Sequence, residues 1–196
     1  MSATLKRRDV VAALLRDRGE LLVVAGLGST AWDISAAGDS ALSFPMWGAM
    51  GNAAMVGLGL ALAQPSRRVL VITGDGEMLM GLGSLATIGV QQPRNLAIAV
   101  IDNERYGETG MQATHTASGV DLAGVARACG FGNAAVVQTE VEFATTRKAL
   151  LGAAGPVFMQ IKVVAEKIPL VLPPRDGGLL KARFRRAVLG PQADAE

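Results

Sequence analysis

Apolar runs and helical repeats alternate along this chain of 196 residues. Short apolar runs bounded by polar or glycine residues predict buried strands at Glu20–Ala25, Arg68–Thr73, Leu96–Ile101, Ala135–Val137 and Val157–Val163. The segments between them predict helices at Arg8–Arg18, Trp32–Ala37, Gly51–Ala63, Met78–Val90, Asp121–Cys129 and Glu140–Leu151. This alternation predicts an α/β fold, with a mostly parallel sheet and helices on both of its faces.

The loops that follow the predicted strands are the expected place of function, because such sheets bind ligands beyond the carboxyl ends of their strands. These loops are Gly26–Thr30, Gly74–Glu77 and Asn103–Thr116. The pair Pro173-Pro174 predicts a boundary. We therefore expect one domain over residues 1–175 and a basic tail over 176–196, which docks on a partner or is solvated.

One apolar stretch, Met46–Ala63, approaches the length of about 18 to 20 residues that spans a bilayer. It contains four glycines and Asn52, and Pro65 follows it closely. These features favour a helix packed between two protein layers, and we expect no membrane span. The charged N-terminus has no apolar core behind it, so no signal peptide is expected.

Composition narrows the class of protein further. Cys129 is the single cysteine, which excludes a disulfide framework and a thiolate iron–sulfur cluster and favours a reducing cytoplasm. The net charge is only +2, and the basic excess lies mainly in the tail at Lys181–Arg186. No nucleic-acid partner is therefore expected.

The candidate chemistry lies at the ends of two predicted strands. One strand ends in Gly74-Asp75-Gly76 and the next in Asp102-Asn103, so that Asn103 follows Asp75 by 28 residues. A carboxylate and an amide oxygen form a hard-oxygen set that suits Mg²⁺ or Ca²⁺, with phosphate and water as further ligands. The glycines beside Asp75 let a phosphate approach the backbone, and the helix that begins near Glu77 points N–H groups at it.

This pattern resembles the pyrophosphate-binding domain of enzymes that use thiamine diphosphate (ThDP), whose signature is Gly-Asp-Gly followed at a distance by Asn-Asn. Asp102 stands here where the family has its first Asn, and Asn103 matches the second. The resemblance implies ThDP and Mg²⁺ as cofactors. It assigns the metal to the side chains of Asp75 and Asn103 and to the backbone carbonyl of Arg105.

Two further segments carry the resemblance. Gly48-Ala49-Met50-Gly51 is similar to the segment that grips the aminopyrimidine ring; it implies a role for the Gly48 carbonyl and for Met50 as a wedge, although a core role for Met50 is the alternative. Gly28-Ser29-Thr30 is similar to a turn that contacts the diphosphate, with Ser29 as the preferred contact. Ser29 fits a helix N-cap equally well.

The resemblance places other cofactor contacts around the same loops, at Gly28, Gly74, Gly76, Glu77, Tyr106 and Gly107. Glu77 departs from the pattern, because a carboxylate beside a diphosphate would repel it. We expect Glu77 to turn outward instead and to interact with the helix dipole.

In this family a glutamate that activates the pyrimidine ring comes from a separate pyrimidine-binding domain. The chain has no residues left for such a domain, so an α-type partner subunit is expected to supply it. A second copy of the chain is expected in the same hetero-oligomer. The hydrophobic content of 50% agrees with a large interface.

Within the family, the chain most resembles sulfopyruvate decarboxylase β subunits and phosphonopyruvate decarboxylases. The segments that carry this likeness are Gly81–Gly89, Tyr106–Gln112, Thr114–Thr116 and Leu180–Phe184. The likeness implies a decarboxylase acting on sulfopyruvate or a similar anionic three-carbon 2-oxo acid. His115 is the candidate to bind substrate or to move a proton, with Gln112, Thr114 and Thr116 as polar companions.

Other classes stay open. They include a β subunit of 2-oxoacid:ferredoxin oxidoreductase, a split carboligase similar to acetolactate synthase, and a ThDP-binding paralogue without turnover. A plain nucleotide-binding module is disfavoured, because the Gly-x-Gly pairs of this chain never complete the Gly-x-Gly-x-x-Gly pattern.

Overall fold

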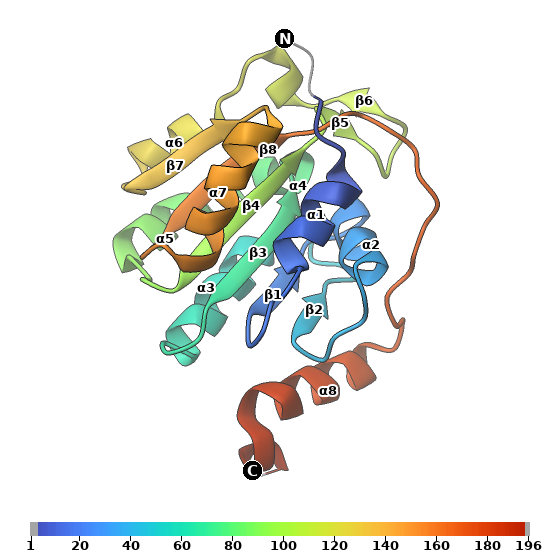
Figure 1. Ribbon diagram of the computed structural model, residues 1–196, viewed down its shortest axis with the longest axis vertical. Helices are drawn as coiled ribbons and strands as arrows, with labels where there is room; N and C mark the ends of the chain where they lie inside the picture. Colours follow the sequence, from blue (N-terminus) through green and yellow to red (C-terminus); the bar gives the residue numbers. More distant parts are fainter. Residues whose placement is uncertain (1–3, 195–196) are drawn as a thin grey trace.

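The computed structural model describes residues 4–194 and contains a six-stranded sheet in the order β2-β1-β3-β4-β8-β7 (Figure 1). All neighbouring strands of this sheet run parallel. The strands are β1 (Leu22–Ala25), β2 (Ser43–Pro45), β3 (Val69–Gly74), β4 (Leu96–Asp102), β7 (Asn133–Val137) and β8 (Val157–Lys162). The predicted parallel α/β sheet is confirmed.

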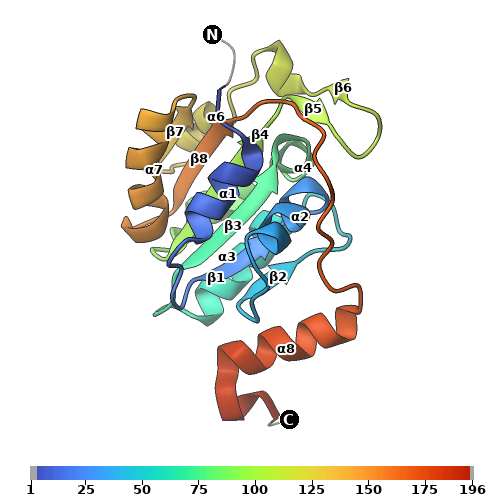
Figure 2. The ribbon, with the colours of Figure 1, turned by 45° about the vertical axis from the view of Figure 1, so that its right-hand side comes forward.

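Helices cover both faces of the sheet (Figure 2). One face carries α1 (Arg7–Leu15), α2 (Ser29–Ala36) and α7 (Glu140–Gly152). The other carries α3 (Ala53–Ala63), α4 (Asp75–Met80), α5 (Ser84–Gln91) and α6 (Leu122–Ala128). The prediction of helices on both faces is therefore confirmed as well.

The central strands are apolar because both of their faces are covered. In β3, Leu70 and Ile72 pack against α1 and α2 on one side, while Val69 and Val71 join the cluster on the other side. All seven residues of β4 are buried. Continuous apolar runs of this kind are typical of parallel strands buried on two sides, which is why the sequence located them.

The helix predicted at Met78–Val90 is two helices, α4 and α5, separated at Gly81–Gly83. The break follows from a close approach of two backbones. A Cβ atom on Gly81 would lie 2.0 Å from the carbonyl oxygen of Gly51. This contact brings the end of α4 against the loop that carries Met50.

The sequence did not predict three short strands, β2, β5 and β6. β2 has three residues and no apolar run, and it is recognisable only through its pairing with β1. β5 (Arg105–Tyr106) and β6 (Gln112–Ala113) form an antiparallel hairpin inside the predicted loop Asn103–Thr116. This hairpin, followed by the 3₁₀ turn η1 (His115–Ser118), lies at the carboxyl end of the sheet (Figure 1).

Helix α3 buries only one side in this chain. Ala54, Leu58 and Ala61 are buried against the sheet, whereas Met55 and Leu62 are exposed. The helix predicted to lie between two protein layers therefore packs on one layer, the sheet of its own chain, and its other side is exposed in this structure. Within residues 4–194, no helix combines the length and the apolar character that crossing a bilayer requires.

The C-terminal segment forms α8 (Gly177–Leu189) and the 3₁₀ turn η2 (Gly190–Asp194). It follows an extended stretch, and Figure 2 shows α8 below the sheet near β2. Phe184 packs on Phe44 with ring centroids 5.4 Å apart. Arg183 donates to both carboxylate oxygens of Asp39. The basic tail thus contacts its own chain beside β2.

Candidate functional site

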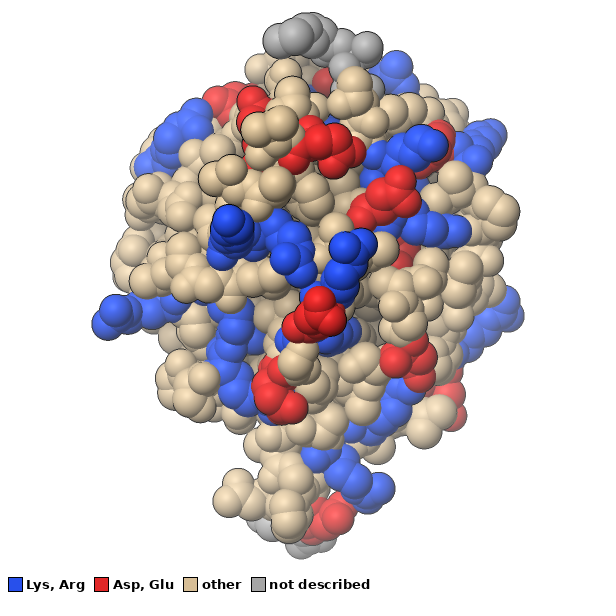
Figure 3. All heavy atoms as spheres, in the orientation of Figure 1, with Lys and Arg blue, Asp and Glu red and all other residues tan. Residues whose placement is uncertain are grey.

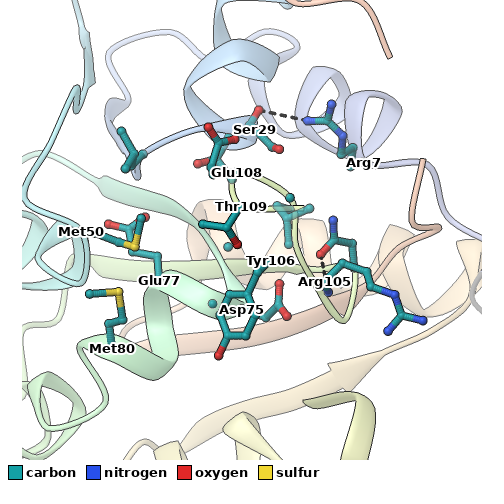
Figure 4. Close-up of a pocket in the computed structure, with 17 residues that line it drawn as sticks. Arg7, Ser29, Met50, Asp75, Glu77, Met80, Arg105, Tyr106, Glu108 and Thr109 are labelled. Carbon is teal, nitrogen blue, oxygen red and sulfur yellow. Dashed lines mark hydrogen bonds between the residues drawn. The ribbon is translucent and has the colours of Figure 1, made fainter. Parts of the chain in front are cut away.

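A cavity of about 170 Å³ opens at the carboxyl ends of the central strands (Figure 4). Residues of all three loops expected from the sequence, Gly26–Thr30, Gly74–Glu77 and Asn103–Thr116, line this cavity. Of the residues predicted there, it is lined by Ser29, Met50, Gly74, Asp75, Gly76, Glu77, Asn103, Arg105, Tyr106 and Gly107. Gly28 directly precedes Ser29, whereas Gly48 and His115 lie outside this lining.

Asp75 is the first residue of α4 and is only 2% exposed. Its Oδ2 accepts a hydrogen bond from the hydroxyl of Thr114 at 2.5 Å, and the hydroxyl oxygen of Thr116 lies 3.3 Å away. Burial, and then the charge of Asp102, raise the pKa of Asp75 to about 6. A cation would favour the ionised form, so the site suits a metal ion on energetic grounds.

Asp102 is fully buried and has a matched set of partners. It accepts from Gln160 Nε2 at 2.6 Å and from Thr116 Oγ1 at 2.8 Å, and Lys162 Nζ lies 2.9 Å away. Burial acts to lower the pKa of Lys162, but its hydrogen bonds to Asp102 and Glu104 outweigh this and raise it. The ammonium of Lys162 therefore balances the carboxylate that replaces the family's amide.

Asn103 lies on the turn between β4 and β5, and Arg105 is the first residue of β5. Asn103 Oδ1 accepts from the backbone N–H of Arg105 at 3.0 Å, which fixes the amide in a local turn. Among residues 4–194, no cluster of three or more His, Cys, Asp and Glu side chains suits a metal ion. An ion at Asp75 would thus depend on amide, carbonyl and non-protein oxygens, the donor set of Mg²⁺.

Glu77 does not turn outward, and that prediction is wrong. Its position on α4 directs the side chain back over the end of β3, where it is 7% exposed and accepts from Thr73 Oγ1 at 2.8 Å. Its Oε2 occupies the space that a Cβ atom of Gly26 would need. Burial raises the pKa of Glu77. Its Oε1 has no hydrogen-bond partner within the described chain.

The ring of Tyr106 lies against Gly76, since a Cβ atom there would be 2.8 Å from two ring carbons. The phenol oxygen of Tyr106 is 3.2 Å from Nδ1 of the exposed His115. Thr114 and Thr116 are not companions of His115, because both are buried against Asp75. Their role is to orient the carboxylate.

The segment Gly48–Gly51, which is predicted to grip a pyrimidine ring, lies at the end of the cavity away from Arg105 (Figure 4). Met50 is 38% exposed and lines the cavity together with Met80. Gly48 is exposed, and a Cβ atom there would meet nothing within 4 Å. The backbone turns sharply, with positive φ at Ala49 and Gly51.

Sequence reasoning missed Arg7 and Glu108, both of which line the cavity. Arg7 Nη1 donates to the carbonyl of Ser29 at 3.1 Å and lies 2.6 Å from Asp33 Oδ2. Arg7 precedes this turn by 22 residues and belongs to a different helix, so no local motif signals it. Glu108 lies in a segment that carried the family likeness, but nothing in the sequence shows where its carboxylate points.

The chain matches a protein-family model described as thiamine pyrophosphate enzyme, C-terminal TPP binding domain, over residues 27–161. It is 35% identical to the sulfopyruvate decarboxylase subunit beta of Methanothermobacter thermautotrophicus over 97% of this chain and 99% of the relative. It is 41% identical to the protein of the same name from Methanocaldococcus jannaschii, over 64% of this chain and 66% of that one.

Among solved structures, the fold is similar to that of benzoylformate decarboxylase from Polynucleobacter necessarius, with a TM-score of 0.70 and 20% sequence identity. The match covers 85% of this chain but 34% of the other. The chain thus corresponds in fold to about a third of that enzyme.

Proposed function

The chain belongs to the thiamine pyrophosphate enzymes, through their C-terminal TPP-binding domain, and from this premise we propose that it is the β-type subunit of a split 2-oxo acid decarboxylase. The proposed cofactors are ThDP, which is thiamine pyrophosphate, and Mg²⁺. The observation that carries the proposal is the buried Asp75 in one cavity with Asn103, with two threonine hydroxyls orienting the carboxylate.

The residues present fit this cofactor by the chemistry of their donors. Asp75, Asn103 and the carbonyl of Arg105 would hold the metal ion. The turn at Gly28 and Ser29, together with Gly74, Gly76, Glu77, Tyr106 and Gly107, would surround the diphosphate, and Gly48 and Met50 would meet the pyrimidine ring. The raised pKa of Asp75 supports this arrangement. Burial and the charge of Asp102 disfavour its ionised form, and a bound cation would stabilise that form.

When bound, ThDP supplies an electron sink for the loss of CO₂ from a 2-oxo acid. The residues of this chain bind and orient it. Thr114 and Thr116 hold one oxygen of Asp75 and leave the other for the metal. Met50, Met80 and Ile101 contribute apolar surface to the cavity.

The exposed apolar side of α3 supports a partner subunit. Met55, Leu62 and, at the end of α4, Met80 are 37%, 51% and 63% exposed. Large apolar side chains left exposed in this way are typical of interfaces. We propose that an α-type pyrimidine-binding subunit covers this side and supplies the activating glutamate, and that a second copy of the chain joins the hetero-oligomer.

The proposed substrate is sulfopyruvate or a similar anionic three-carbon 2-oxo acid. It rests on the relatives named sulfopyruvate decarboxylase subunit beta. His115 stays the candidate for substrate binding, now paired with Tyr106, whose ring does line the cavity.

Three further proposals concern the domain bounds, nucleic-acid binding and the location of the protein. Residues 1–175 would form the cofactor-binding domain, and the tail at 176–196, which contacts its own chain beside β2, would present its remaining surface to a partner or to solvent. The face in Figure 3 mixes basic and acidic side chains, which supports the expectation of no nucleic-acid partner. A cytoplasmic location is expected from the single cysteine.

Reconstitution tests the proposed function. Alone, the chain should release almost no CO₂ from any 2-oxo acid, because the activating glutamate is missing. With its cognate α-type subunit, Mg²⁺ and ThDP, it should release CO₂ from sulfopyruvate faster than from pyruvate. Strong decarboxylation by the isolated chain would contradict the split site. Activity that requires ferredoxin and coenzyme A would favour the oxidoreductase class instead.

Replacement of Met50 distinguishes a wedge from a core residue. If Met50 holds the cofactor in its reactive shape, Met50→Ala should lower kcat about tenfold or more, while a residue 38% exposed costs little stability on truncation. Thermal unfolding and steady-state kinetics of the reconstituted complex provide the two readouts. Val141→Ala serves as the control and should change neither readout, since Val141 is 80% exposed on α7 and does not line the cavity. Normal kcat with a loss of about 2 kcal/mol or more in stability would assign Met50 to the core.

A further inference from the structure

A carboxylate lies at the end of the cavity where the proposed function puts a phosphate. Glu108 extends from the loop between β5 and β6 to the turn at Gly28, and Figure 4 shows it beside Ser29. A Cβ atom on Gly28 would lie 2.6 Å from Glu108 Oε1 and 2.8 Å from its Cδ. The carboxylate therefore packs directly on the backbone of this turn.

The turn offers what an anion needs. Gly28 has φ +79° and precedes α2 as its N-cap, so it has no side chain to cap the first N–H groups of that helix. Such N–H groups bind anions. A hydrogen bond from Arg7 to the carbonyl of Ser29 also fixes the position of this turn.

Arg7 adds a positive charge to the same end of the cavity. It is 4% exposed, and one of its nitrogens, Nη1, makes the contacts to both Ser29 and Asp33. A guanidinium has five N–H donors in total. Burial raises the pKa of Glu108 and the charge of Arg7 lowers it, so the two charges are close enough to interact.

We propose that the Glu108 carboxylate occupies the place of the cofactor's terminal phosphate, and that the diphosphate displaces it and becomes the anion that faces Arg7. This inference rests on the proposed function, because it takes the cavity to be a ThDP site. The segment Gly107–Gly110 is exposed and has a glycine at each end, so its backbone can carry the side chain away. Arg7 and Glu108 thus become determinants of cofactor affinity.

Two substitutions of Glu108 separate displacement from simple charge repulsion. Glu108→Gln removes the charge, and Glu108→Asp keeps the charge on a side chain too short to reach Gly28. Titration calorimetry of the full chain with Mg²⁺ and inorganic pyrophosphate should show binding about fivefold tighter for Glu108→Gln. Glu108→Asp should also bind more tightly than the unaltered chain. Both variants should fold normally, because Glu108 is an exposed loop residue.

Asp9→Asn is the matched control, since it removes an exposed carboxylate from α1 only two residues after Arg7. It should leave pyrophosphate affinity unchanged. Unchanged or weaker binding by Glu108→Gln would overturn the proposal, as would Glu108→Asp binding like the unaltered chain. These results differ from a failure of the proposed function, which would appear as no CO₂ release by the complex whatever the pyrophosphate affinities are.

Discussion

Asp75→Asn is expected to weaken binding of ThDP with Mg²⁺ by about 100-fold or more, a loss of about 2.7 kcal/mol. The amide keeps the shape of the side chain but lacks the charge that holds the cation. Without the cation, the diphosphate keeps the positive charge of Arg7 but loses that of the metal, and Glu77 still repels it. Titration calorimetry of the reconstituted complex measures the loss. Removal of Mg²⁺ with a chelator should weaken the unaltered protein to a similar degree and leave the variant unchanged.

The same substitution should make the metal-free chain more stable. The pKa of Asp75 is about 6 in the folded chain against an ordinary value of 3.8. A raised pKa means that ionisation disfavours the folded state as the pH rises from about 4 to about 6, by up to about 3 kcal/mol at neutral pH. Asp75→Asn abolishes this penalty, so its thermal midpoint at pH 7 without Mg²⁺ should be higher.

A gain in stability with a loss of affinity is the signature of a residue kept for binding. Glu140→Gln, an exposed neutralisation at the start of α7, should leave the affinity unchanged and should lower the stability by about 1 kcal/mol or less, because it removes only a helix-dipole interaction. If Asp75→Asn binds ThDP and Mg²⁺ normally, Asp75 is not a metal ligand and the proposed site is wrong.

The sequence located the cavity because its three loops follow strands with unambiguous apolar runs. β3 and β4 are buried along almost their whole length, so the ends at Asp75 and Asn103 could be placed within a residue or two. Parallel pairing between β3 and β4 then brings both residues to one edge of the sheet. This step requires only the α/β pattern, which is a strong signal in this chain.

The orientation of side chains could not be predicted in the same way. Glu77 turns inward because Gly26 leaves room for its carboxylate and Thr73 donates to it, and both contacts cross between elements. Lys162 balances Asp102 from β8, 60 residues further along the chain. Contacts of this kind depend on how the elements pack, and no local pattern records them.

Among the substitutions proposed for this chain, Asp33→Ala is expected to lower the free energy of unfolding most. Asp33 is fully buried and lies 2.6 Å from Nη1 of Arg7 and 3.1 Å from Nε of Arg8. Asp33→Ala would leave the buried guanidinium of Arg7 without its ion-pair partner at 2.6 Å, which costs about 3 to 5 kcal/mol. Urea denaturation of the variant and of the unaltered chain measures the difference. The turn at Ser29 should loosen as well, because Arg7 holds its carbonyl.

Asp39→Ala is the matched control for this prediction. Asp39 also lies 2.6 Å from an arginine, Arg183, but its side chain is 64% exposed, whereas that of Asp33 is fully buried. Solvent screens such a pair, so its loss should cost about 1 kcal/mol or less. Equal losses of stability in the two variants would show that burial does not set the strength of the Arg7–Asp33 pair.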